Sequence, residues 1–211
     1  MKLAVFGATG ETGLLLVQLA LQHGHWVTAF ARRPDKLCWD HPALRIDAGE
    51  LTDEGAIDHA VEGADAVISL LGPRADWEGK PITQGTKNIL AAMQRHDVRR
   101  LVVVSTASAR DPEDAPDPKF RLFVSLVKLG ARPAYEDIVS TAAVVRSSDR
   151  DWTIVRVPLL TNGERTGRVN VGYLGDARLG TFLSRANMAD FLLRQIGDTS
   201  YLRRSPAISN G

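Results

Sequence analysis

Residues 2–13 read KLAVFGATGETG, and this stretch decides the fold. Lys2 to Phe6 is an apolar run that predicts a buried strand, and Thr12 to His23 carries apolar side chains at helical spacing. Between them stands the glycine loop Gly7-Ala8-Thr9-Gly10-Glu11-Thr12-Gly13. A strand that passes through a glycine-rich turn directly into a helix is typical of the first unit of a doubly wound α/β fold.

The three glycines of this loop have separate roles, because glycine accepts positive φ and lets another backbone approach closely. We expect Gly7 to allow the tight turn, Gly10 to admit a phosphate to the backbone, and Gly13 to permit close helix–strand packing. The amides and the positive end of the following helix then face the phosphates. The loop therefore predicts a dinucleotide site, and a glycine-rich turn without a ligand is the alternative.

Apolar and amphipathic stretches alternate along the rest of the chain, as they do where helices cover both faces of a parallel sheet. Further strands are expected at Trp26 to Ala31, Ala43 to Ile46, Ala64 to Leu71, Leu101 to Val104 and Trp152 to Val157. Two more helices are expected at Asp53 to Val61, with Thr52 as N-cap, and at Pro81 to His96. This order predicts one doubly wound Rossmann domain over residues 1–211, with a mostly parallel sheet flanked by helices. The substrate pocket is expected from about residues 105–190.

The bulk composition excludes several classes of protein. Lys plus Arg number 26 and Asp plus Glu 25, and the net charge of +1 gives no reason to expect a nucleic-acid or membrane partner. The single cysteine, Cys38, allows no intramolecular disulfide, which fits a cytoplasmic protein. Cys38 is expected to be an ordinary half-buried side chain near a loop, and no metal site is expected. No apolar run approaches the ~20 residues that span a bilayer.

The end of the second predicted strand indicates which dinucleotide binds. Sites that select NAD place an acid there, which accepts hydrogen bonds from the adenosine ribose. Here Ala31 is followed by Arg32-Arg33, with Lys36 close behind. A guanidinium can hold a 2′-phosphate by two parallel hydrogen bonds. The pattern favours NADP(H), with Arg32 as the main contact, and a solvated basic turn is the alternative.

Two more strand ends carry candidate cofactor contacts. Asp47 follows the third predicted strand, where a carboxylate either accepts a hydrogen bond from the adenine amine or belongs to the turn before a helix. Leu71 and Gly72 end the fourth strand beside the glycine loop, where a glycine lets the backbone pass under the cofactor. Arg74 reaches either the phosphates or an anionic substrate, or is a solvated loop residue.

These motifs resemble those of the atypical short-chain dehydrogenase/reductases, which carry a G-A-T-G-x-x-G loop. The resemblance extends through LLG at 70–72, STA at 105–107, DWTIVR at 151–156 and SRANMAD at 184–190. The branch concerned contains small NAD(P)H-binding proteins related to biliverdin reductase B, a flavin reductase; NmrA-like proteins, some of which are cofactor sensors, are a neighbouring branch. The resemblance implies an NADP site built from Gly7, Thr9, Gly10, Thr12, Gly13, Arg32, Asp47, Leu71, Gly72 and Arg74. To these contacts we add Glu11, Arg33, Lys36 and Pro158.

The chain departs from this superfamily where catalysis is expected. The wider superfamily uses Tyr-x-x-x-Lys, in which the lysine lowers the pKa of the tyrosine. Tyr135 is the best-placed tyrosine, but Val139 stands four residues later. Tyr135 is therefore expected as a pocket wall or hydrogen-bond donor. Asp137 either orients its helix or contacts a ligand. The five histidines all lie in the first half of the chain, away from the substrate end of the sheet.

Hydride transfer does not itself need a protein acid or base, because the nicotinamide carries the chemistry. An apolar pocket is expected from Ser105, Thr106, Tyr135, Pro158 and Leu159, with Ser105, Thr106 and Tyr135 as the catalytic candidates. The two hydroxyls of Ser105 and Thr106 bond the nicotinamide or an acceptor oxygen, or they cap the following turn. We therefore expect an NADPH-dependent reductase of a small planar or carbonyl acceptor, such as a flavin or quinone.

The alternative is a non-catalytic NADP(H) redox sensor that binds a protein partner. Its contact surface would be the apolar helix expected at Lys119 to Leu129, which follows the acidic, proline-rich loop Arg110 to Pro118. That helix otherwise packs on the sheet edge or forms a lid over the pocket. The expected partner of an enzyme is a small-molecule acceptor, and the expected state is a monomer or weak homodimer.

Overall fold

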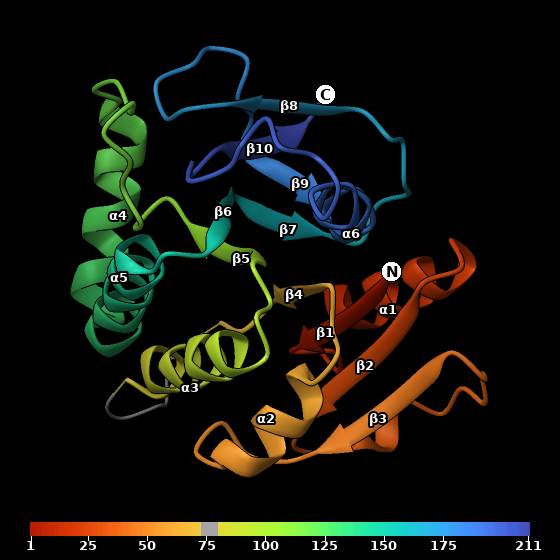
Figure 1. Ribbon diagram of the computed structural model, residues 1–211. Helices are drawn as coiled ribbons and strands as arrows, with labels where there is room; N and C mark the ends of the chain where they lie inside the picture. Colours follow the sequence, from red (N-terminus) through yellow and green to blue (C-terminus); the bar gives the residue numbers. More distant parts are fainter. Residues whose placement is uncertain (73–79) are drawn as a thin grey trace.

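The computed structural model of the chain describes residues 1–72 and 80–211 (Figure 1). Its strands are β1 (Lys2–Phe6), β2 (Trp26–Ala31), β3 (Leu44–Ala48), β4 (Ala66–Ser69), β5 (Arg100–Thr106), β6 (Asp151–Val157), β7 (Leu159–Thr161), β8 (Val169–Gly172), β9 (Phe182–Ser184) and β10 (Ala207–Asn210). Its helices are α1 (Glu11–Gln22), the 3-10 turn η1 (Pro34–Lys36), α2 (Glu54–Val61), α3 (Pro81–Arg95), α4 (Pro118–Gly130), α5 (Arg132–Ser147) and α6 (Arg185–Arg194).

Eight of these strands form one sheet in the order β3-β2-β1-β4-β5-β6-β10-β8. Every neighbouring pair is parallel except β10 and β8, which are antiparallel. The strand order reverses between β1 and β4, and such a switch point opens a crevice at the carboxyl ends of the strands. Strands β7 and β9 form a separate parallel pair. The predicted Rossmann-type fold with a mostly parallel sheet is confirmed.

The core lies on both faces of the sheet, as the strands' apolar character on both sides requires. On one face, α1 and α6 pack against the strands through buried residues such as Leu16 and Leu192. On the other, α2, α3 and α5 do so through Ile57, Met93 and Val145. Figure 1 shows α1 and α6 on one side of the strands, with α3 and α5 across from them. Helix α4 lies outside this layer, beside α5.

Several element boundaries differ from those predicted. Helix α2 begins one residue late, because Asp53 and not Thr52 is its N-cap: the Asp53 carboxylate accepts a hydrogen bond from the Ala56 amide at 3.0 Å. Strand β3 continues to Ala48, so Asp47 lies within the strand and does not follow it. In the described part of the chain, no helix is long and apolar enough to cross a membrane.

Candidate functional site

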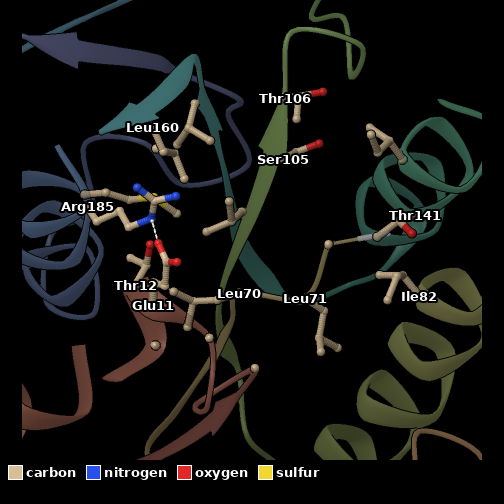
Figure 2. Close-up of a pocket in the computed structure, with 18 residues that line it drawn as sticks. Glu11, Thr12, Leu70, Leu71, Ile82, Ser105, Thr106, Thr141, Leu160 and Arg185 are labelled. Carbon is tan, nitrogen blue, oxygen red and sulfur yellow. Dashed lines mark ion pairs between the residues drawn. The ribbon is translucent and has the colours of Figure 1, made fainter. Parts of the chain in front are cut away.

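A cavity of about 330 Å³ opens at the carboxyl ends of the central strands, at the switch point of the sheet. The glycine loop forms one wall, the ends of β4, β5 and β6 form the floor, and residues of α3, α5 and α6 close the sides (Figure 2). It is lined by Gly7, Gly10, Glu11, Thr12, Gly13, Leu70, Leu71, Gly72, Ile82, Val104, Ser105, Thr106, Ile138, Thr141, Val157, Leu160, Arg185 and Met188. The cavity therefore joins the predicted phosphate loop to the predicted nicotinamide end.

The glycine loop has the geometry that the sequence predicts. Gly7 has a φ of 81°, a left-handed conformation that glycine adopts without strain. A side chain at Gly13 would place its Cβ 2.2 Å from the Gly7 carbonyl oxygen, so only glycine fits where α1 meets the loop. Gly10 is the N-cap of α1, and its amide donates to the Gly7 carbonyl at 3.1 Å. The first amides of α1 have no partner within the helix, and Glu11, Thr12 and Gly13 line the cavity, an arrangement that suits anion binding.

Arg185, the first residue of α6, is a cavity residue that was not predicted. Its Nε lies 2.7 Å from a Glu11 carboxylate oxygen, and its Nη1 donates to the Asn162 side chain at 2.7 Å. The motif around Arg185 was visible in the sequence, but nothing local indicates that α6 lies against the glycine loop. Tertiary packing of α1 against α6 brings the two together.

The end of β2 carries the predicted basic cluster outside this cavity. Arg32, Arg33 and Lys36 are exposed, and Arg32 Nε lies 4.0 Å from a carboxylate oxygen of Glu50. Glu50 follows the neighbouring strand β3 and was not predicted as a site residue. Glu50 thus places a carboxylate beside Arg32 at the end of β2.

Asp47, by contrast, is held by its own surroundings. Its carboxylate lies 3.0 Å from His59 Nδ1 and 3.2 Å from an Arg45 side-chain nitrogen, and its side chain is 10% exposed. The prediction that Asp47 stands after the strand is wrong, because β3 pairs with β2 as far as Ala48. Arg74, also predicted as a contact, lies outside the described residues.

Ser105 and Thr106 both line the cavity, but their hydroxyls differ. Thr106 Oγ1 accepts a hydrogen bond from the Ser108 amide at 3.3 Å, so it caps the turn after β5. The Ser105 hydroxyl makes no hydrogen bond with the described residues. Of the two, Ser105 is therefore the one whose hydroxyl is open to a ligand.

The other predicted pocket residues do not share this cavity. Tyr135 lines a neighbouring cavity of about 240 Å³ beyond the end of β5, where Lys128 Nζ lies 5.7 Å from its ring centroid. The lysine thus comes from α4 and contacts the ring face. Pro158 lines a third, much smaller cavity, and the Leu159 side chain is half exposed. The residues predicted to share one pocket thus line different cavities, with Ser105 and Thr106 in the first, Tyr135 in the second and Pro158 in the third.

Asp137 makes structural contacts with a neighbouring helix. It is 1% exposed, and its carboxylate accepts hydrogen bonds from the amides of Ile82 and Thr83 at 3.0 and 2.8 Å. The Thr83 hydroxyl donates to it at 2.6 Å. A carboxylate on α5 therefore caps the N-terminus of α3, which otherwise has no side-chain cap. This contact fixes Ile82 in the cavity wall.

Two comparisons by sequence bear on this cavity. Over residues 7–199 the chain matches the NAD(P)H-binding family. A 3 beta-hydroxysteroid dehydrogenase/Delta 5→4-isomerase of Mycobacterium tuberculosis is 34% identical over 119 residues, which are 51% of this chain and 32% of that protein. A 2-alkyl-3-oxoalkanoate reductase of Stenotrophomonas maltophilia is 33% identical over 118 residues, 51% of this chain and 34% of that protein. The chain thus matches about a third of the length of either relative.

The fold also matches solved structures. A short-chain dehydrogenase/reductase of Veillonella parvula, solved in complex with NADP, superposes with a TM-score of 0.78 at 18% identity. The superposition covers 99% of this chain and 94% of that chain. At this identity the likeness establishes the shared fold.

Proposed function

Because this chain belongs to the NAD(P)H-binding family, which includes oxidoreductases, we propose that it is an NADPH-dependent reductase of a small planar or carbonyl acceptor. The observation that carries the proposal is the continuous cavity from the glycine loop to Ser105. Its lining is mostly apolar, with Val157, Leu160 and Met188 in the wall. Such a wall suits a flat, weakly polar acceptor of the flavin or quinone kind.

The preference for NADPH rests on the end of β2. Three cations stand there within five residues of one another, and Arg32 has the planar group that matches a phosphate. Glu50 faces Arg32 from the next strand and is 65% exposed, so it can orient the guanidinium without withdrawing it from solvent. Arg33 and Lys36 add positive charge around the same position.

The chain's own residues would orient and shield the reaction. A bound nicotinamide supplies the hydride. The Ser105 hydroxyl donates a hydrogen bond to an acceptor oxygen or to the carboxamide, and the apolar wall excludes bulk water from the transfer. The charged residues among the described cavity lining are Glu11 and Arg185, both at the phosphate end. In this proposal the acceptor takes its proton from solvent water after the hydride transfer.

Steady-state oxidation of NADPH against a panel of flavins, quinones and aldehydes tests this proposal. We expect turnover with at least one planar acceptor, and slower turnover with NADH because it lacks the 2′-phosphate. Tight NADPH binding with no turnover on any acceptor would contradict a reductase.

A second candidate, a redox sensor, is favoured by one observation on α4. Leu122, Leu126 and Leu129 are 64%, 60% and 88% exposed, and their spacing places them along one side of the helix. A partner protein bound there would respond to the state of the cofactor. A pull-down that captures the same protein with NADPH but not with NADP⁺ would support the sensor, and equal capture in both states would oppose it.

A further inference from the structure

The Arg185 guanidinium spans the phosphate end of the cavity, from α6 to the first turn of α1 (Figure 2). It is held at both ends, by Glu11 and by Asn162, and the side chain is 23% exposed. The start of α6 is fixed by its N-cap, because Ser184 Oγ accepts a hydrogen bond from the Asn187 amide at 3.0 Å. The guanidinium is therefore placed by a rigid helix end.

Glu11 places a negative charge beside the Arg185 guanidinium, at the end of the cavity that is expected to bind phosphates. Glu11 is the first residue of α1, and its carboxylate stands at the helix end where the amides would receive a diphosphate. Two negative groups at one helix terminus repel each other. Of the described residues that line the cavity, Arg185 is the cation, and it already contacts that carboxylate.

We propose that Arg185 binds the diphosphate of the dinucleotide, and that Glu11 neutralises the guanidinium until the cofactor displaces it. This proposal rests on dinucleotide binding at the glycine loop. Arginine has N–H groups in excess of the two that contact Glu11 and Asn162, and its planar fork suits phosphate oxygens. On binding, the guanidinium exchanges a carboxylate oxygen for phosphate oxygens, while Asn162 keeps its position.

A purely structural role, in which the ion pair ties α1 to α6, makes a different prediction. Arg185→Gln should weaken NADPH and NADH alike by roughly 10- to 100-fold, because the diphosphate is common to both. Glu11→Gln should strengthen both by about 2- to 5-fold, since it removes a like charge and a competitor for Arg185. If the pair were only a tie, both substitutions would weaken binding and lower the melting temperature together.

Equilibrium titration of the folded variants, followed by intrinsic fluorescence or calorimetry, measures these effects. ADP and AMP serve as further probes: Arg185→Gln should cost more affinity for ADP, which has a diphosphate, than for AMP. Arg194→Gln on the same helix is the matched control, because Arg194 pairs with Asp190 and does not line the cavity. It should bind all probes like the wild type.

Weakened binding by Glu11→Gln, or an equal loss of ADP and AMP affinity in Arg185→Gln, would overturn the proposal. The test depends on binding alone, so an absence of turnover, which would contradict the reductase, leaves it intact. Arg32→Ala distinguishes the 2′-phosphate from the diphosphate. It should weaken the binding of NADPH more than that of NADH, whereas Arg185→Gln should weaken both alike.

Discussion

Arg156 and Asp114 form a two-pronged ion pair that is closed to solvent. Both N–O distances are 2.7 Å, and the two side chains are 1% and 0% exposed. Arg156 Nε donates further to the Ser205 carbonyl, and Asp114 accepts from the Leu174 amide at 3.0 Å. The pair ties β6 to the loop that leads into α4. Because Ala115 of that loop lines the cavity of Tyr135, the ion pair positions this wall.

Removing one partner of this pair should destabilise the protein strongly. Asp114→Ala leaves the Arg156 guanidinium buried without its counter-charge, and we expect a loss of about 3–5 kcal/mol in the free energy of unfolding. Urea denaturation measures it. Glu136→Ala is the control, since the Glu136–Arg132 pair is exposed and should contribute little to stability. Similar losses in the two variants would contradict the importance of burial here.

The Asp114 carboxylate should make the stability of the protein depend on pH. Burial alone would raise the pKa of Asp114, but hydrogen bonds from Arg156 and from the Asp111 amide outweigh it, and the pKa lies below its ordinary value. A carboxyl with a lowered folded-state pKa adds stability above its unfolded value of about 3.9, and that stability is lost as the pH falls through the folded-state pKa. The stability difference between wild type and Asp114→Ala should therefore be constant from pH 7 to about 5 and shrink below about 4. A difference that shrinks on raising the pH would reverse the assigned sign.

The elements that could be predicted from sequence are those built from continuous apolar runs. Strand β1 agrees in its limits, because Leu3 to Phe6 are buried on both sheet faces and the glycine loop ends the strand. The loop at residues 110–118 was predicted from its acidic and proline-rich composition, yet Asp114 is buried. Its counter-charge lies on β6, 42 residues away, and no local pattern shows such a pairing.

The candidate site shows the same difference between residues placed by local sequence and residues placed by tertiary packing. The residues of the glycine loop could be predicted because strand, turn and helix are adjacent in sequence. Glu50 and Arg185 were missed because each reaches the site only through tertiary packing. Tyr135 was predicted into the pocket as the best-placed tyrosine of the chain, although it lacks the lysine of the superfamily motif; in the structure α5 presents Ile138 and Thr141 to the cavity instead.

Gly13 should tolerate no side chain. In Gly13→Ala the new Cβ would meet the Gly7 carbonyl oxygen at 2.2 Å and the Ala8 backbone at 2.8 Å, so α1 must move away from the loop. We expect a loss of about 3 kcal/mol or more in stability, together with loss of dinucleotide binding. Gly197→Ala, where the added Cβ meets nothing within 4 Å, should change stability by less than about 0.5 kcal/mol. Thermal unfolding and NADPH titration of both variants provide the measurement.

Arg32→Ala should weaken NADP(H) binding by about 1–3 kcal/mol, the usual scale for losing a charged hydrogen-bond partner. NADH binding should stay nearly unchanged, because it has no 2′-phosphate. Arg45→Ala on the neighbouring strand is the control: its guanidinium is bonded to the His59 carbonyl and lies beside Asp47. Titration with both dinucleotides compares the variants, and an equal loss for NADPH and NADH would refute the 2′-phosphate assignment.

Substitutions at the three catalytic candidates, Ser105, Thr106 and Tyr135, should have different effects on turnover and stability. Ser105→Ala removes a cavity hydroxyl that has no partner among the described residues, and we expect kcat/KM to fall by about tenfold, one hydrogen bond's worth of transition-state stabilisation. Thr106→Val removes the acceptor of the Ser108 amide, so its main effect should be a lower melting temperature. Tyr135→Phe should keep turnover within about threefold, because Tyr135 lines another cavity. Steady-state kinetics on one acceptor ranks the variants. A collapse of kcat in Tyr135→Phe alone would contradict this ranking, because it would assign proton transfer to the tyrosine and require that its cavity open to the nicotinamide.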